Sequence, residues 1–209
     1  MAWLRIERLT WAERALWVAL IVGSVAPTAL LPGAEDVVRA YLAAVDGGDI
    51  DAALALTSHD FVLGPPLGGY VRGSEAVRNA LEYRAALNER WRVIDWEDDA
   101  SQGQVHAVFL VTNDAWELVG SRPVLGVVYL VRDDRLLLER VYSGGHEARR
   151  ELRSFLQWAS AERPRDLAAV WQEGRPVRDP EAAPALLELL RAWKADRDPL
   201  ADDGESSQG

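Results

Sequence analysis

The stretch that decides the fold covers residues 34–63 and reads AEDVVRAYLAAVDGGDIDAALALTSHDFVL. Apolar residues recur at helical spacing up to Gly47-Gly48, a pair typical of a helix end. Asp49 is well suited to cap a second helix, because a short acidic side chain accepts hydrogen bonds from the first backbone N–H groups. A short strand over 61–63 follows. The stretch therefore predicts two helices that meet at a tight corner and lead into a strand.

A third helix and a run of strands are expected further along the chain. Ser74 opens the helix after a Gly/Pro-rich loop over 64–69. Beyond Asn88 the apolar pattern alternates, and it predicts strands over 91–97, 104–113, 115–119, 124–132 and 136–143. Helices followed by such strands predict an α+β fold, in which a curved antiparallel sheet wraps around three N-terminal helices as a cone.

Composition narrows the class of protein. A chain of 209 residues with 49% hydrophobic content is long enough for one main domain with extensions. The net charge of −10 argues against nucleic acid as a partner, because phosphate binding needs clustered Lys and Arg. The absence of cysteine excludes disulfides and thiolate metal sites. The three histidines lie far apart in the sequence, so neither a metal nor another cofactor is expected.

The N-terminal segment, residues 1–34, is expected to direct the chain to a membrane. Residues 15–34 form a run of twenty residues without a charge, and three arginines precede it. Twenty apolar residues span the hydrocarbon core of a bilayer, and a basic flank favours the cytoplasmic side. This indicates a single-pass anchor in the cytoplasmic membrane, with the C-terminal domain outside. A cleaved signal of a secreted protein and a soluble amphipathic helix that packs on the domain stay open.

Three motifs in order carry a resemblance to a known superfamily. They are AYLAAVDGGDIDAAL over 40–54, GYVRGSEAVRNAL over 69–81 and VVYLVRDDRLLLERVYS over 127–143. Together they resemble the nuclear transport factor two-like superfamily, which includes SnoaL-like and ketosteroid-isomerase-like proteins. The resemblance implies a cone domain over 35–144 whose apolar interior is the usual ligand site.

The same resemblance implies where isomerase groups would lie. It places Tyr41 at the tyrosine that holds the oxyanion, Pro65 at the general-base carboxylate and Val128 at the protonated carboxylic acid. Proton abstraction beside a carbonyl needs both a base and donors for the oxyanion. With two of the three groups apolar, isomerase activity is not expected, and the sequence favours a protein that is not an enzyme.

The sequence assigns a catalytic role to no side chain. Tyr41, Asp95, His106 and Asp114 are the weak candidates. Asp95 and Asp114, with Arg92 and Arg132, would suit an epoxide-hydrolase arrangement, but charges on strands commonly face solvent. A lone histidine such as His106 is more often hydrogen-bonded structure than a base.

Aromatic and apolar residues are the candidates for binding a flat apolar ligand in the cone. Ordinary core packing is the competing explanation for them. The predicted ligand-binding residues are Tyr41, Trp91, Trp116, Val128 and Tyr142.

A helical extension is expected over 145–195, with helices over 145–161 and 165–172 and a last one that starts at Pro184. Its apolar faces are expected to cover the open face of the sheet, or else to bind a partner. A homodimer or a protein partner through the sheet face or these helices fits either case. Residues 196–209 read as a disordered acidic tail.

Together these observations favour a membrane-tethered, non-catalytic ligand-binding or assembly module. The alternative is a small-molecule enzyme of the polyketide-cyclase kind, which acts on an apolar substrate in the cone. A buried carboxylate that faces the pocket within reach of Tyr41 would distinguish the alternative.

Overall fold

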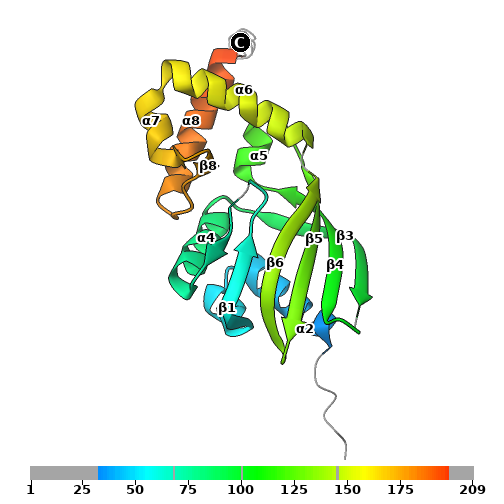
Figure 1. The fold of residues 1–209 in the computed structure, drawn as a ribbon. Helices are drawn as coiled ribbons and strands as arrows, with labels where there is room; N and C mark the ends of the chain where they lie inside the picture. Colours follow the sequence, from blue (N-terminus) through cyan, green and yellow to red (C-terminus); the bar gives the residue numbers. More distant parts are fainter. Residues whose placement is uncertain (1–32, 68, 100, 145, 198–209) are drawn as a thin grey trace, which may run out of the picture. The chain divides into compact units, whose positions relative to one another are not determined.

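The computed structural model describes residues 33–67, 69–99, 101–144 and 146–197 (Figure 1). The anchor or signal predicted within residues 1–34 falls almost wholly outside the described residues, as does most of the predicted acidic tail. No helix within the described part of the chain is long and apolar enough to cross a membrane.

Three helices lie in the first part of the described chain, as the sequence predicts. They are α2 (Ala34–Asp46), α3 (Ile50–Ala55) and α4 (Ser74–Ala86). The Asp49 carboxylate accepts a hydrogen bond of 2.9 Å from the Ala52 N–H, which confirms the predicted cap of α3. The turn between α2 and α3 passes through Gly48, whose φ of +73° lies in the region that favours glycine.

The sheet has six strands in the order β2-β1-β6-β5-β4-β3. Its strands are β1 (Thr57–Gly64), β2 (Val71–Arg72), β3 (Arg90–Asp99), β4 (Gln104–Thr112), β5 (Val124–Arg132) and β6 (Arg135–Gly144). β3 to β6 form an antiparallel meander, but β1 pairs with β6 in parallel, so the sheet is mixed. The purely antiparallel sheet predicted from sequence is therefore wrong at this pair, because β1 reaches β6 through a long crossover and not through a hairpin.

The stretch over 115–119 is helical and not a strand as predicted. It lies in α5 (Asp114–Leu118), where the Asn113 side chain accepts a 2.7 Å hydrogen bond from the Trp116 N–H. A five-residue apolar run does not distinguish a strand from a helical turn by periodicity, and here the cap selects the helix.

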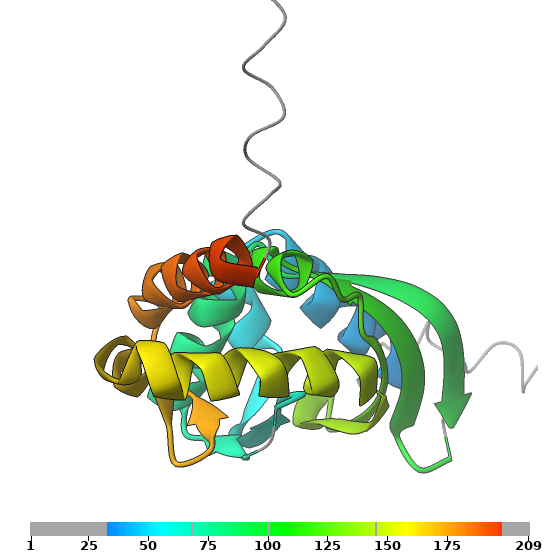
Figure 2. The same cartoon turned by 90° about the horizontal axis from the view of Figure 1, so that it is seen from above.

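The inner face of the curved sheet packs against the N-terminal helices (Figure 2). Strand β4 shows the alternation plainly: Val105, Ala107, Phe109 and Val111 are buried, and the residues between them are half-buried. Inside the cone, the Phe109 ring packs in edge-to-face contacts with the rings of Trp91 and Tyr129. The ring centroids are 5.0 Å and 6.3 Å apart, respectively. The cone interior is therefore an aromatic-rich core.

The C-terminal extension forms a second helical layer at one end of the cone (Figures 1 and 2). It comprises α6 (His146–Glu162), α7 (Pro164–Val170), a hairpin of β7 (Trp171–Gln172) and β8 (Arg175–Pro176), and α8 (Ala182–Arg197). Helix α8 packs on α4 and α5. The expectation that the extension covers the open face of the sheet is therefore wrong, because its apolar side chains are buried against helices.

Candidate functional site

A buried charged cluster lies inside the cone. Arg84, on the inner side of α4, is 8% exposed, and Glu139 on β6 is 1% exposed. Arg84 Nη2 donates to Glu139 Oε1 over 2.8 Å, and Arg84 Nε donates to Glu89 Oε1 over 2.9 Å. Burial acts to lower the pKa of Arg84, but the two carboxylates outweigh it and raise that pKa, so the guanidinium stays charged.

Aromatic and amide groups complete the surroundings of Glu89. Trp91 Nε1 donates to Glu89 Oε1 over 2.8 Å, and Asn113 Nδ2 donates to Glu89 Oε2 over 2.9 Å. The Arg84 guanidinium also stacks over the Trp91 ring, 4.6 Å from its centroid. Each carboxylate oxygen of Glu89 thus has a partner, and Glu89 is held rigidly at the start of β3.

Three buried polar atoms in this region lack a hydrogen bond of good geometry to any described residue, although Tyr41 lies close enough to Glu139 for a hydrogen bond to contribute to its pKa. They are the hydroxyl groups of Tyr41 and Tyr129 and the second carboxylate oxygen of Glu139. Burial, and then the charge of Glu139, raise the pKa of both tyrosines well above the usual value, so they remain neutral phenols. Unpartnered buried polar groups are rare in proteins.

A cavity of about 80 Å³ lies beside the cluster, between α4, the loop after β1 and the C-terminal extension. Most of its wall is apolar, and the residues that shape it include Leu63, Pro65, Leu87, Trp116, Leu186 and Leu190. The polar side chains in its wall are Tyr83, Arg84, Glu89, Asn113 and Arg178. An apolar cavity with a few placed polar groups is the usual form of a small-molecule site.

Tyr83 on α4 and Arg178 of the extension both line this cavity, and the charge of Arg178 acts on the Tyr83 hydroxyl. Burial lowers the pKa of Arg178 to about 10, which still leaves the guanidinium charged at neutral pH. Burial raises the pKa of Tyr83, so its hydroxyl keeps its proton. Both groups therefore present hydrogen-bond donors.

Three of the predicted ligand-binding residues lie inside the fold. Tyr41 is fully buried and Trp91 is 7% exposed, and both belong to the surroundings of the charged cluster rather than to the cavity wall. Trp116 does line the cavity, as does Pro65, the residue that the resemblance places at the general-base position. Whether any of them contacts a ligand stays a prediction.

Val128 and Tyr142 lie on the outer face of the sheet, so the interior placement predicted for them is wrong. Val128 pairs in register with His106 and Arg140, and its neighbours Val127 and Tyr129 point inward instead. Tyr142 sits at an irregularity in the β5–β6 pairing and is 52% exposed. Tyr142 follows Val141, which pairs with the buried Val127, so ordinary alternation along β6 turns Tyr142 outward.

The remaining candidates are dispersed. His106 is half-buried on the outer face, 6.2 Å from the Tyr142 ring between centroids. Asp95 is exposed on β3, and its carboxylate accepts from the Trp96 N–H over 2.9 Å. Asp114 accepts from Asn88 Nδ2 over 2.8 Å in the first turn of α5. None of these side chains lines the cavity, and no group of residues suited to a metal ion occurs in the described ranges.

Sequence reasoning missed Arg84, Glu89, Glu139 and Arg178. A signal for Arg84 was present, because it follows Val77, Ala80 and Leu81 at helical spacing on the buried face of α4. Arg178 lies beyond the three motifs, in a segment whose position depends wholly on tertiary packing. No local pattern pointed to it.

The helices, the mixed curved sheet and the interior polar cluster define an α+β cone domain. A family model described as a SnoaL-like domain matches residues 38–138. Residues 38–138 therefore carry a SnoaL-like domain, and the resemblance seen in the three motifs is confirmed.

Solved structures with a similar fold come from several bacteria. A nuclear transport factor two-like protein of unknown function from Cytophaga hutchinsonii is 16% identical, with 55% of this chain and 93% of that chain covered and a TM-score of 0.46. A protein provisionally assigned as a polyketide cyclase, from Sinorhizobium meliloti, is 18% identical over 51% and 94%, with a TM-score of 0.45. No protein of curated function matches the chain.

Proposed function

We propose that this chain is a membrane-tethered, non-catalytic binding module whose small ligand occupies the cavity between the cone and the C-terminal extension. The observation that carries the proposal is the cavity itself, with apolar walls and buried hydrogen-bond donors. Binding sites need this combination, since apolar area supplies affinity and a few polar groups fix orientation.

The arrangement of the carboxylates favours binding over catalysis. A general base must lie within hydrogen-bond reach of the proton that it removes. Glu89, the carboxylate in the cavity wall, accepts hydrogen bonds from Arg84, Trp91 and Asn113. Glu139 is bonded to Arg84 and does not line the cavity. Neither carboxylate is therefore placed to remove a proton from a ligand there.

The tether belongs to the proposal and rests on the uncharged run over 15–34 behind three arginines. Such a segment would hold the binding domain on the outer side of a cytoplasmic membrane. Native mass spectrometry of full-length protein from the membrane fraction, beside a version that begins at Glu35, tests both parts. We expect the full-length protein from the membrane fraction to keep its N-terminus, and we expect a small ligand on both the full-length and the shortened protein. A cleaved N-terminus would exclude the tether. If neither protein holds a small molecule after purification or binds one that is added, the binding function would be excluded.

One observation favours the enzyme alternative. Glu139 is a buried carboxylate whose charge contributes to the raised pKa of Tyr41, and one of its oxygens is unpartnered among the described residues. If the cavity opened towards it, this pair would supply a base and a donor for proton abstraction beside a carbonyl. Exchange of α-protons of butanone in D₂O, followed by NMR, tests this. We expect the wild type to exchange these protons no faster than the Glu139→Gln variant does. Faster exchange by the wild type, lost in the variant, would show that the protein is an enzyme and would overturn our proposal.

A further inference from the structure

We propose that the ligand of the cavity is a short monocarboxylic acid, and that Arg178 of the C-terminal extension binds its carboxylate. The inference rests on the proposed binding function and names its ligand class. It also makes the extension part of the site, although the extension lies outside the SnoaL-like domain matched over residues 38–138.

The acceptors in the cavity wall are already used. The Glu89 carboxylate receives hydrogen bonds from Arg84, Trp91 and Asn113 at 2.8–2.9 Å. The Asn113 side-chain oxygen receives the Trp116 N–H at 2.7 Å, as the cap of α5. A ligand that offers only donors would therefore find few partners in this wall.

The donors of the wall can serve more than one acceptor. A guanidinium group carries five N–H donors in a planar fork, so Arg178 can keep a protein partner and still bind a ligand. Tyr83 adds a protonated hydroxyl to the same cavity wall. A carboxylate matches this surplus better than any neutral head group, because it accepts several hydrogen bonds and pairs with the guanidinium charge.

A second arginine, Arg175, lies at the edge of the site, where its guanidinium also pairs with Glu173 over 2.9 Å. Gly69 has a φ of +75°, and a Cβ atom there would lie 3.2 Å from Arg175 Nη1 and 3.8 Å from Arg178 Nη1. The guanidinium groups of Arg175 and Arg178 thus lie close to the loop at Gly69, where a larger side chain would crowd them. After burial, the charges of Arg84 and Arg175 are among the causes that lower the pKa of Arg178, so a bound anion would stabilise its charged form.

The volume limits the acid to a short chain. The cavity measures about 80 Å³, whereas an engineered cavity that holds benzene measures about 150 Å³. Propionate and butyrate are therefore the probes of choice. Leu87, Trp116 and Leu190 would contact the methyl end, and the walls supply little else for a polar tail.

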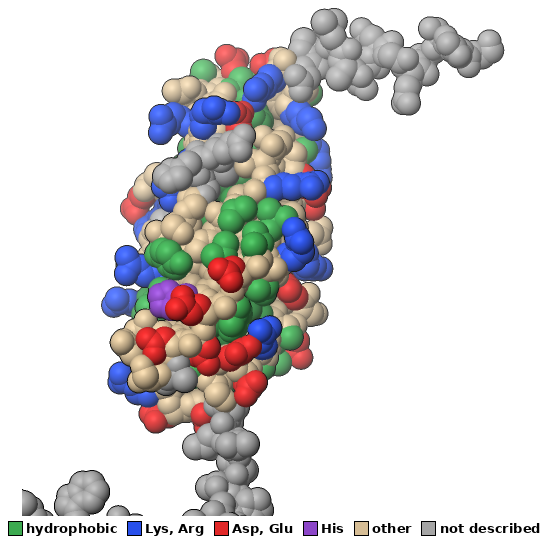
Figure 3. Space-filling model, turned by 90° about the vertical axis from the view of Figure 1, so that its right-hand side faces the viewer, with side chains coloured by type: hydrophobic (Ala, Val, Ile, Leu, Met, Phe, Trp, Pro, Cys, Tyr) green, Lys and Arg blue, Asp and Glu red, His purple; other side chains and the backbone are tan. Residues whose placement is uncertain are grey.

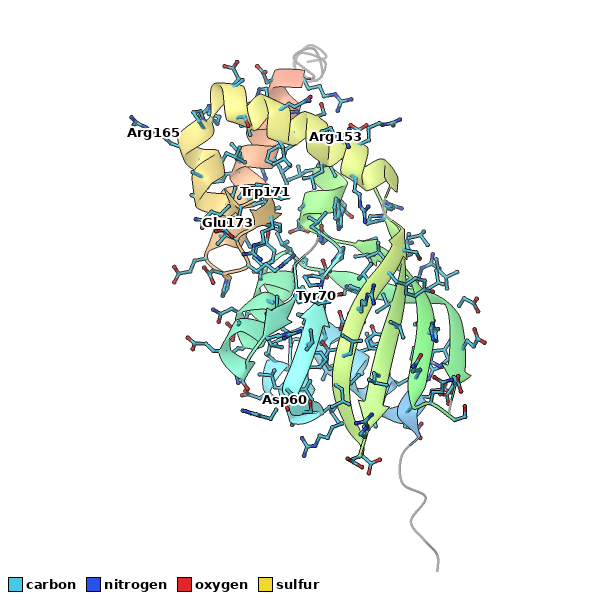
Figure 4. The ribbon with its side chains drawn as sticks, viewed as in Figure 1. Asp60, Tyr70, Arg153, Arg165, Trp171 and Glu173 are labelled. Carbon is cyan, nitrogen blue, oxygen red and sulfur yellow. The ribbon has the colours of Figure 1, made fainter. Side chains whose placement is uncertain are left out.

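The test is NMR titration of the ¹⁵N-labelled full-length chain with propionate and butyrate, and with propionamide and butyramide as neutral analogues. The titrations are repeated on Arg178→Gln and Tyr83→Phe. The matched control is Arg165→Gln, because Arg165 is an exposed arginine of the extension that points away from the cavity (Figure 4). A thermal melt of each variant checks that it folds.

We expect the acids to bind the wild type and the control alike, and Arg178→Gln to bind them about tenfold more weakly with little change for the amides. Tyr83→Phe, which keeps the ring, should weaken the acids about threefold and keeps the inference testable if Arg178→Gln does not fold. Amides that bind as tightly as acids, with no effect of Arg178→Gln, would overturn the carboxylate assignment and leave the binding function standing. If neither the acids nor the amides bind, both the carboxylate assignment and the proposed binding function would be overturned.

Discussion

Arg84 Nη2 lies 2.8 Å from Glu139 Oε1 in the interior of the cone, and the two residues are 55 positions apart in the sequence. The pair ties α4 to β6, while the second bond of Arg84, to Glu89, ties α4 to the start of β3. One buried cation thus holds three elements together, and its two carboxylates depend on it.

Arg84→Met should therefore be strongly destabilising. Removing one partner of a buried ion pair costs about 3–5 kcal/mol, because the other partner keeps its charge without compensation. Urea denaturation measures the loss in free energy of unfolding. Arg78→Met is the control, because Arg78 pairs with Asp51 on the surface and its loss should leave the midpoint almost unchanged. Equal midpoints for the two variants would show that the cluster does not stabilise the fold.

Asp46 provides a pH-dependent prediction. Burial, partly opposed by a hydrogen bond from the Trp91 backbone, raises its pKa above 3.8 in the folded protein. The folded state then binds a proton more readily than the unfolded state, so stability contributed by this group falls as pH rises through the window between the two pKa values. Asp46→Asn should be more stable than the wild type at neutral pH, and this advantage should disappear in acid. Urea midpoints from about pH 4 to about pH 8 measure it; a variant less stable at neutral pH would contradict the assignment.

Leu190→Ala should enlarge the cavity. Leu190 is 2% exposed and lines the cavity from α8. Truncation of a buried leucine costs about 2–5 kcal/mol, seen as a lower melting temperature, and the added space should shift binding from propionate towards hexanoate. Leu189→Ala is the matched control, because Leu189 is also buried on α8 but does not line this cavity. The same acid preference in both variants would argue that ligands bind elsewhere.

The homodimer through the sheet face stays a prediction, and the outer face supports it. One row of paired residues crosses four strands and consists of Arg140, Val128, His106 and Glu97. The positive charge of Arg140 and the negative charge of Glu97 lie at its opposite ends. Figure 3 shows this side of the molecule, where hydrophobic side chains lie among acidic and basic ones. A two-fold axis parallel to the strands would place Arg140 of one copy against Glu97 of the other, with the apolar residues between them.

Tyr142→Asp tests that interface, because Tyr142 is 52% exposed on this face. Light scattering of the eluting protein should show a dimer for the wild type and a monomer for the variant. Tyr70→Asp changes another exposed tyrosine, one that follows the loop beside the cavity, and should leave the mass unchanged. A wild type that is already monomeric would exclude the dimer.

The sequence by itself determined the order of the helices and most of the strands, because these depend on local signals. Helical spacing and the Asp49 cap place α2 and α3, and alternation places β4, β5 and β6. The same motifs were enough to identify the superfamily. At α5 two local signals competed. The apolar run over 115–119 predicts a strand, but the cap by Asn113 selects a helix.

Only the tertiary structure decided the site. Arg84, Glu139 and Arg178 come from α4, β6 and the extension, and nothing local in the sequence shows that these segments meet. Tyr142 follows the inward-facing Val141 and turns outward, so the interior position that the resemblance implied for it depended on a register that only the structure shows. Charged side chains enter a core only when partners distant in sequence compensate them, so their positions depend on the folded chain as a whole.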